Sequence, residues 1–344
     1  MRTCAGGQAA RRRGRLVAIW LGLLLGVAGP TPARAAEPAA AQVTVEAVWP
    51  PAGARLAEPL VGPSAVVLDR AGRVWVAEPQ ADRVIRLPDP AAGTPRIATP
   101  DGVLRRPLGV AAAPDGTLLV ADTGNHRIVR LAPDGRIVAT YGGPGKDPGE
   151  FERPSAVAAA PDGTFLVADT GNHRVQRLDP AGRPLSTMGR LGSGPGDLVE
   201  PAGIAVAPDG RIAVADTGNH RIVLLAPDGE PLAVVGRPGR GADGLLRPTG
   251  LAYAPDGALW IADTGNHRLV RTDGERFLAR IGKLGRGPGE LQEPSGLAVA
   301  PNGDLLVADT ANDRIQRLRV SPAALAAAEG ATLAAAGRPD LAVP

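Results

Sequence analysis

Acidic and basic side chains recur in this sequence at one fixed spacing, and that spacing limits the chemistry they can do. An acid is followed five residues later by an arginine in six segments: Glu78/Arg83, Asp122/Arg127, Asp169/Arg174, Asp216/Arg221, Asp263/Arg268 and Asp309/Arg314. A carboxylate beside an arginine could act as a general base. A catalytic carboxylate has no reason to occur in every segment, whereas residues that flank a four-residue hairpin loop lie opposite each other, with Cβ atoms about 5 Å apart. We therefore interpret these pairs as structural.

The four histidines occupy one equivalent position, directly before the arginine, at His126, His173, His220 and His267. Asp82 and Asp313 stand at that position in the first and last segments. Imidazole and carboxylate groups are common metal ligands, but each ligand must lie about 2 Å from the ion. Equivalent loops of successive repeats are spread around a wide ring, so these side chains should not converge. The pattern predicts no metal or cofactor at the histidines, and it assigns no catalytic residue.

These segments belong to a repeat of nearly constant length. The acids at 78, 122, 169, 216, 263 and 309 are 44, 47, 47, 47 and 46 residues apart. Each repeat holds four short apolar runs, separated by loops such as P-D-G and T-G-N-H, that are too punctuated for helices. The second run is apolar at nearly every position, as in Leu118–Ala121, which indicates a strand covered on both faces. The spacing predicts an all-β protein, a six-bladed β-propeller with four-stranded antiparallel blades.

The two ends of the repeat region predict how the ring closes. The last repeat has only three runs, because the residues from Ser321 onward are Ala-rich and carry no turn signal. A spare run, Val43–Trp49, precedes the first repeat. We expect this N-terminal strand to complete the last blade and so to cover an exposed edge. Between blades, we expect Trp260 to fill the space left by the small Ala213 of the preceding repeat.

The repeat resembles those of the NHL-repeat family of β-propellers. The resemblance rests on P-x-G-[IV]-A-x-x-P-D-G, on V-A-D-T-G-N-H-R-[IV], and on the linker G-x-G-P-G-E-[LF]-x-x-P at Gly143–Pro154 and Gly285–Pro294. It covers roughly Val43 to Val320 and is specific for the fold. The family includes RNA-binding modules, protein-interaction platforms and enzymes related by shape, so the resemblance does not choose among these functions.

Residues 1–35 have the order of a secretory signal. A basic segment at 11–15 precedes an apolar segment at 16–27 and a stretch of small residues that ends near Ala35. The apolar segment is short for a membrane span, so we expect an exported protein, periplasmic or extracellular, with no membrane span in the mature chain. The predicted domains are a signal peptide at 1–35, a propeller at 36–320 and an Ala-rich tail at 321–344, partly helical or disordered.

Removal of the signal changes the charge of the chain. The whole sequence has a formal net charge of +3, but residues 1–35 contain six arginines and no acidic residue, which leaves 32 basic against 35 acidic residues. Nucleic-acid binding rewards a strongly basic surface, so this balance argues against a nucleic-acid partner. The one cysteine, Cys4, lies within the signal, so the mature chain is expected to form no disulfide.

Two regions remain as candidate sites. The axis should be lined by the first runs, which begin with small or hydroxyl residues such as Ser155 and Ser295, and no base stands beside these hydroxyls. The linkers between repeats vary most in charge and size, and variable loops on a rigid scaffold often bind partners. The candidate binding face, formed by the linkers and the T-G-N-H loops, contains Lys146, Glu150, Arg190, Arg240, Lys283, Glu290, His126, His173, His220 and His267.

These observations lead to two functional hypotheses. The first is an exported, non-catalytic scaffold that binds a protein, peptide or glycan outside the cytoplasm on the candidate binding face. The alternative is a metal-assisted propeller enzyme, of the lyase or the lactonase and hydrolase type, with an axial site. The alternative requires histidine or acidic ligands near the axis, and the starts of the first runs offer none. The regular repeat and the unreactive axis favour the scaffold.

Overall fold

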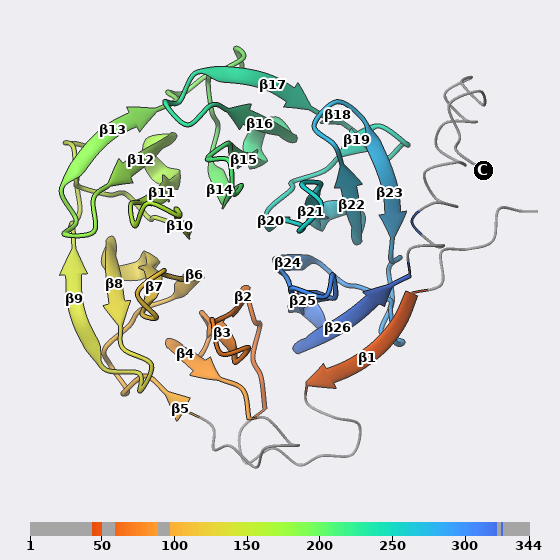
Figure 1. Cartoon of the computed structure of the whole chain (residues 1–344), viewed down its shortest axis with the longest axis horizontal. Coiled ribbons are helices and arrows are strands. Elements are labelled where there is room, and N and C mark those ends of the chain that lie inside the picture. The colour runs from red at the N-terminus through yellow and green to blue at the C-terminus, as the bar shows by residue number, and fades with distance from the viewer. Residues whose placement is uncertain (1–42, 50–58, 89–96, 322–324, 326–344) are drawn as a thin grey trace, which may run out of the picture. The chain divides into compact units, whose positions relative to one another are not determined.

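The computed structural model describes residues 43–49, 59–88, 97–321 and 325, with the side chains of residues 97 and 98 left aside. The expected signal at 1–35 and nearly all of the expected tail at 321–344 lie outside the described residues. Within the unit that begins at Pro38, the described strands form six four-stranded antiparallel sheets arranged as blades around one axis (Figure 1). The predicted fold class, an all-β propeller with six blades, is confirmed.

Each blade runs from an inner to an outer strand in chain order. Blade one contains β2 (Ala65–Leu68), β3 (Val74–Glu78), β4 (Arg83–Arg86) and β5 (Ile97–Ala98). Blade two contains β6 (Pro107–Ala112), β7 (Leu118–Asp122), β8 (Arg127–Leu131) and β9 (Ile137–Tyr141). Blade three contains β10 (Ala156–Ala159), β11 (Phe165–Asp169), β12 (Arg174–Leu178) and β13 (Pro184–Met188).

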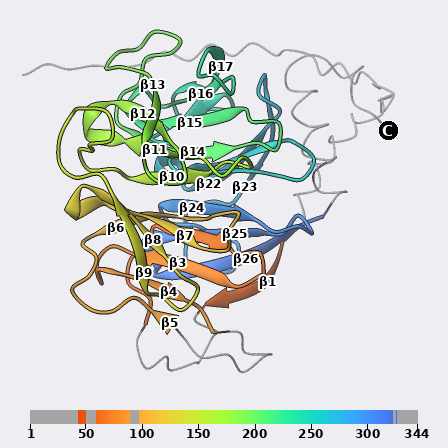
Figure 2. The same ribbon diagram turned by 60° about the vertical axis from the view of Figure 1, so that its left-hand side comes forward.

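The remaining blades repeat this order. Blade four contains β14 (Pro201–Val206), β15 (Ile212–Asp216), β16 (Arg221–Leu225) and β17 (Pro231–Val235). Blade five contains β20 (Leu251–Tyr253), β21 (Leu259–Asp263), β22 (Arg268–Thr272) and β23 (Phe277–Ile281). Blade six contains β24 (Pro294–Val299), β25 (Leu305–Asp309), β26 (Arg314–Val320) and, as its outer strand, β1 (Val43–Trp49). The same ring, turned to bring other blades forward, is shown in Figure 2.

Short elements connect these strands. In blades two to six, the loop after the second strand is a single turn of 3-10 helix: η1 (Thr123–Asn125), η2 (Thr170–Asn172), η3 (Thr217–Asn219), η4 (Thr264–Asn266) and η5 (Thr310–Asn312). The linker between blades four and five forms a small parallel pair, β18 (Arg237–Pro238) with β19 (Gly244–Leu245). The 3-10 turns have the same backbone conformation in blades two to six, so the side chains they carry lie at equivalent points around the ring.

Blade six closes the ring as the sequence predicted. β1 pairs with β26 in antiparallel register, from Val43 opposite Val320 to Trp49 opposite Ile315. A bulge falls between Val45 and Ala47. The strand that begins the described chain therefore covers the edge of the last sheet, which would otherwise present unpaired backbone groups to solvent.

The core lies between the blades. In blades two to six every residue of the second strand is buried, as are all five residues of β11. Successive side chains of a strand point to opposite faces of its sheet, so a strand between two neighbours must be apolar at each position. Leu119 of blade two packs with Phe165 and Val167 of blade three in one such layer. The apolar second runs thus form the contacts that hold adjacent blades together.

The expected contact between Trp260 and Ala213 is wrong. Trp260 packs against Leu297 and Leu305 of blade six, whereas Ala213 packs against Leu259 of blade five. Equivalent residues on successive blades point the same way around the ring, so Trp260 faces the following blade and cannot reach back to blade four. Trp260 is still a core residue, with only 3% of its surface exposed.

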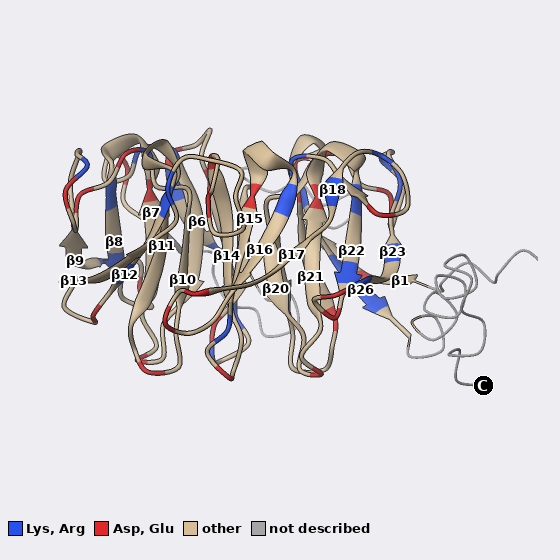
Figure 3. Cartoon of the chain, turned by 90° about the horizontal axis from the view of Figure 1, so that it is seen from above, with Lys and Arg blue, Asp and Glu red and all other residues tan. Residues whose placement is uncertain are grey.

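The two ends of the propeller differ in character. Figure 3 shows the blades from the side, with acidic and basic residues close together near one end and acidic turn residues at the other. The interblade linkers and the T-G-N-H loops share the first end, because Gly171 of one such loop donates its N–H to the Glu152 carbonyl of the linker. The P-D-G turns form the other end. We call these the linker face and the turn face.

Candidate functional site

The acid and arginine of each repeat lie opposite each other at the linker face. In all six blades the two residues are register partners, and the arginine Nε lies 2.6–2.8 Å from a carboxylate oxygen. Asp169 is fully buried and also accepts bonds from the Glu152 N–H at 2.6 Å, from Asn172 and from Gln176. Beyond the arginine, the donors to this carboxylate therefore come from the linker backbone and from neighbouring side chains. The carboxylate fastens the linker to the blade and has no free face for catalysis.

The histidines join neighbouring blades. Nδ1 of each one accepts the backbone N–H of a residue in the next linker: His126 from Arg153 at 3.2 Å, His173 from Glu200 at 3.0 Å, His220 from Arg247 at 3.0 Å and His267 from Glu293 at 3.1 Å. Asp82 and Asp313 do the same for Arg106 and Gly62, at 2.6 and 2.7 Å. All six residues adopt the left-handed conformation, which histidine and aspartate tolerate better than most residues.

This arrangement gives the histidines a structural reason to recur. They lie along the rim and line neither axial cavity. Within the part of the chain that the structure describes, no group of three or more histidine, cysteine or acidic residues is placed to hold a metal ion. From the sequence, we included the histidines in the candidate binding face. Each histidine accepts a hydrogen bond from the linker to the next blade, and no pattern within one repeat reveals that bond.

The axis is narrow at the linker face. A cavity of about 180 Å³ is lined there by the starts of the six inner strands. The hydroxyls expected in this region bond to backbone carbonyls of the following blade: Ser64 to Leu108 at 2.8 Å, Ser155 to Ala202 at 3.4 Å, Thr249 to Ser295 at 3.2 Å and Ser295 to Ser64 at 2.9 Å. A Cβ at Gly203 would lie 1.8 Å from the Thr249 carbonyl oxygen, so glycine there permits the close approach of adjacent strands. These hydroxyls hold the inner strands together.

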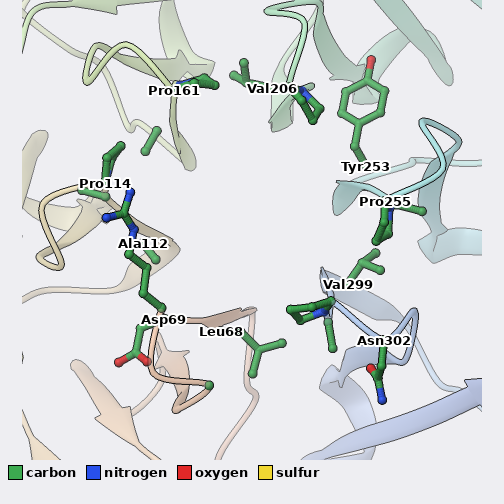
Figure 4. Close-up of a pocket in the computed structure, with 18 of the residues that line it drawn as sticks. Leu68, Asp69, Ala112, Pro114, Pro161, Val206, Tyr253, Pro255, Val299 and Asn302 are labelled. Atoms are coloured by element: carbon green, nitrogen blue, oxygen red, sulfur yellow. The ribbon is translucent and has the colours of Figure 1, made fainter.

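The axis opens at the turn face into a much larger cavity. Its volume is about 880 Å³, and Figure 4 shows the residues that surround the opening. The ends of the inner strands form an inner ring of six residues, Leu68, Ala112, Ala159, Val206, Tyr253 and Val299. The P-D-G turns add an outer collar of five prolines and one arginine, Pro114, Pro161, Pro208, Pro255, Pro301 and Arg70. The walls are therefore mainly apolar, and the size falls within the range of roughly 300–1,000 Å³ typical of small-molecule sites.

Two polar residues of this cavity have shifted acidities. Burial raises the pKa of the Tyr253 phenol, the Arg211 charge lowers it by a smaller amount, and the Asp209 charge raises it further. Burial by itself also raises the pKa of Asp69, but hydrogen bonds from Trp75 and Arg73 outweigh it, and the net shift is downward from 3.8. Asp69 accepts Nε of Arg73 at 2.6 Å and Nε1 of Trp75 at 3.0 Å on one oxygen, and two backbone N–H groups on the other. Asp69 is thus an ionised, fully bonded turn residue.

The candidate binding face predicted from the sequence lies at the opposite end from this cavity. Lys146, Arg190, Arg240 and Lys283 are exposed there. Lys283 pairs with Glu290 at 3.3 Å, and Arg190 pairs with Asp197 at 3.0 Å. The N–H of Gly287 and the Lys283 ammonium lower the pKa of Glu290. These contacts order the linkers, and a partner for this face remains a prediction.

Sequence reasoning missed the turn-face cavity because it considered only the starts of the inner strands. The signal was present at their other ends. The last position of the first run reads Leu, Ala, Ala, Val, Tyr and Val across the six repeats, and the first repeat has Arg70 where the others have proline. Such variation within a near-exact repeat marks the place where the blades are not equivalent. Among the described residues, no helix is long and apolar enough to cross a bilayer.

The fold and this cavity define a six-bladed propeller with an open axial site. Residues 51–318 match the virginiamycin B lyase family, and the chain belongs to that family. The resemblance to NHL-repeat proteins is therefore supported at the level of a six-bladed propeller, whereas the family that matches is the lyase family. No curated protein matches the chain.

Solved structures with similar folds include several enzymes. A streptogramin B lyase is 18% identical, with 77% of this chain and 96% of that chain covered and a TM-score of 0.57. A catalytically inactive histidine-to-alanine variant of virginiamycin B lyase from Staphylococcus aureus, with quinupristin, is 19% identical over 78% and 83%, with a TM-score of 0.57. A gluconolactonase from Xanthomonas campestris is 17% identical over 76% and 87%, also at 0.57. At these identities the likeness shows the shared fold alone.

Proposed function

We propose that this protein is a propeller enzyme of the lyase type that acts on a small organic molecule held in the turn-face cavity. The observation that carries the proposal is the cavity itself, about 880 Å³ of mainly apolar space on the axis of a chain that belongs to a lyase family. The family favours the enzyme over the scaffold that the sequence led us to expect first. The proposal moves the site from the linker face to the turn face.

The cavity is suited to binding an apolar or aromatic molecule. Leu68, Val206 and Val299 offer apolar contacts, and Tyr253 offers one aromatic face. The Tyr253 ring is half-buried against the core between blades four and five, and its hydroxyl points away from the centre of the cavity (Figure 4), so Tyr253 contributes part of its ring to the cavity wall. A lyase breaks a bond by elimination, in which a base removes a proton from the neighbouring carbon while the leaving group departs with its electron pair.

A second candidate is a binding propeller without catalytic activity. The observation that favours it is that all four histidines of the chain and Asp69 already bond to the protein itself. In one similar protein, replacement of a histidine gives an inactive enzyme. In this protein the histidines bond to the linkers at the linker face. The side chains that line the cavity can therefore bind a molecule, but no histidine lies among them to remove a proton.

Mass spectrometry of candidate reactions separates these possibilities. The chain from residue 36 onward would be incubated with quinupristin and with a panel of lactones, and products and thermal shifts would be recorded. Elimination opens a ring without a change in mass, whereas hydrolysis adds the mass of one water. We expect product with the parent and with Leu232→Ala, an exposed residue of β17, and at least about a tenfold loss with Tyr253→Ala.

The outcomes are distinct. Binding without product would favour the second candidate, and a ring-opened product that contains added water would replace the lyase by a hydrolase. A parent protein that neither binds nor converts any compound would contradict the proposal that the cavity is a small-molecule site. A Tyr253→Ala variant as active as the parent would also contradict it.

We further propose that the protein acts outside the cytoplasm. The support is the order of basic, apolar and small residues in 1–35. N-terminal sequencing of the protein from a culture that expresses the full chain should give a mature protein that begins near Glu37, in the periplasmic or medium fraction. Full-length protein in the cytoplasmic fraction would contradict this proposal.

A further inference from the structure

The collar of the turn-face cavity carries one cation among five prolines. Blade one has Asp69-Arg70-Ala71-Gly72 where the other blades have turns such as Ala113-Pro114-Asp115-Gly116. The turn itself is conserved in shape, because Gly72 donates its N–H to the Asp69 carbonyl as Gly116 does to Ala113. Arg70 therefore occupies the place of a collar proline and lines the cavity with the rest of the collar.

The other charged side chains that line the cavity, Asp69 and Arg317, form ion pairs within the protein. Arg73 lies 2.6 Å from Asp69, and Arg317 lies 2.8 Å from Asp304. Three acids of the turns also have arginine partners, namely Asp115 with Arg130, Asp209 with Arg211 and Asp256 with Arg271, whereas Asp162 accepts bonds from Thr164 and lies outside the cavity lining. Arg70 is exposed, and within the described part of the chain it forms no ion pair or hydrogen bond. Among the residues that line the cavity, Arg70 thus presents one uncompensated positive charge beside apolar walls.

We propose that the cavity binds an organic anion, with its apolar or aromatic body against the inner ring and its carboxylate or sulfonate on the Arg70 guanidinium. This inference rests on the proposed function and names its substrate class. A guanidinium presents a planar set of donors that can bind both oxygens of such a head group. The five collar prolines have no side-chain donors, so the head group has a single preferred position on the rim. Tyr253 supplies the aromatic contact for the body.

A matched pair of fluorescent probes tests the charge preference. Anilinonaphthalene sulfonate and phenylnaphthylamine share an aromatic amine body and differ by the sulfonate. We expect the parent to bind the anionic probe about five- to tenfold more tightly at low salt, because an ion pair at an exposed rim is modest in strength. Arg70→Gln should remove this preference and Arg70→Lys should keep part of it, whereas Tyr253→Ala should weaken both probes. Arg240→Gln, at an exposed residue of the linker face, is the matched control and should change neither.

Failure of this inference can be told apart from failure of the proposed function. Equal affinity of the two probes for the parent, or a preference that survives Arg70→Gln, would overturn the anion proposal and leave the small-molecule cavity standing. A parent that binds neither probe would contradict the cavity as well. Loss of the preference in Arg240→Gln instead of Arg70→Gln would place the anion site on the linker face and overturn the inference.

Discussion

At the scale of single residues, the repeated motif attaches the linkers to the blades by hydrogen bonds. The buried carboxylate accepts bonds from an arginine, an asparagine and a linker N–H, as Asp169 illustrates. The residue before the arginine accepts an N–H from the next linker, as His173 illustrates. A buried carboxylate is stable only when its hydrogen bonds are satisfied. The requirement is the same in every blade, which explains why the motif recurs and why it reveals little about function.

The first prediction concerns the buried acid. Asp169→Ala removes the group that holds four donors, including the Arg174 guanidinium, and should lower the free energy of unfolding by about 3–5 kcal/mol. Urea unfolding followed by circular dichroism would measure it. Arg136→Ala, which breaks the exposed pair with Asp134, is the control and should leave the midpoint unchanged. Equal effects of the two changes would mean that the motif pair is ordinary surface charge.

The second prediction concerns the histidine position. His173→Asp places the residue that blades one and six use there, and it should preserve stability. His173→Gly tolerates the positive φ but lacks the acceptor, and it should cost about 1 kcal/mol. The midpoints of thermal unfolding of the two variants provide the comparison. Two silent variants would show that the bond to Glu200 contributes nothing.

At the scale of elements, the ring depends on its closing strand. β1 pairs with β26 through backbone hydrogen bonds. Arg319 of β26 also lies 3.0 Å from Glu46 of β1 and 3.0 Å from Asp304 in the turn before β25. Asp304 has 1% of its side chain exposed and also binds Arg317. Burial alone raises the pKa of Asp304, but hydrogen bonds from Arg319, Asn302 and Arg317 lower it below 3.8. Its carboxylate thus stabilises the blade that joins the chain ends.

The third prediction follows from the sign of that shift. A carboxyl whose pKa is lowered by folding stabilises the protein above its unfolded pKa, and the contribution disappears as the pH falls through the folded value. Asp304→Asn should therefore be less stable than the parent at neutral pH, and the difference should shrink below about pH 4. Unfolding titrations across this range would measure it. A difference that stays constant with pH would show that the ionised form is not what matters.

The fourth prediction concerns the strand itself. A chain that begins at residue 50 lacks β1 and should melt at a lower temperature and aggregate more than a chain that begins at residue 36, because the edge of β26 is then uncovered. Calorimetry and light scattering of the two chains would provide the measurement. Identical melting of the two chains would contradict the closure.

At the scale of the whole propeller, periodicity explains what the sequence could predict. The blades, their order and the opposed acid and arginine follow from patterns repeated about every 47 residues, and the closing strand follows from the run that the last repeat lacks. The direction of Trp260, the partner of each histidine and the turn-face cavity do not, because each depends on contacts between blades. The cavity in particular lies among the ends of all six inner strands, and no single repeat shows how far apart those ends are.

Only a few residues of the repeat distinguish the blades from one another at this cavity. Arg70 and Tyr253 are single departures from a common pattern, yet they give the cavity its unpaired cation and its aromatic ring. Export from residues 1–35 and a macromolecular partner at the linker face remain predictions. The enzyme and the non-catalytic propeller differ in whether the bound molecule is converted, and they share the same site.

The location of that site is the central claim, and binding of the neutral probe phenylnaphthylamine to two variants tests it most directly. Ala159→Trp adds an indole to the wall of the turn-face cavity and narrows it, whereas a combined change of Lys146, Arg190, Arg240 and Lys283 to alanine alters only the linker face. Titration by fluorescence should show binding weakened in the first variant and unchanged in the second. Binding that survives Ala159→Trp but is lost in the linker-face variant would place the site at the opposite end of the propeller and contradict the account.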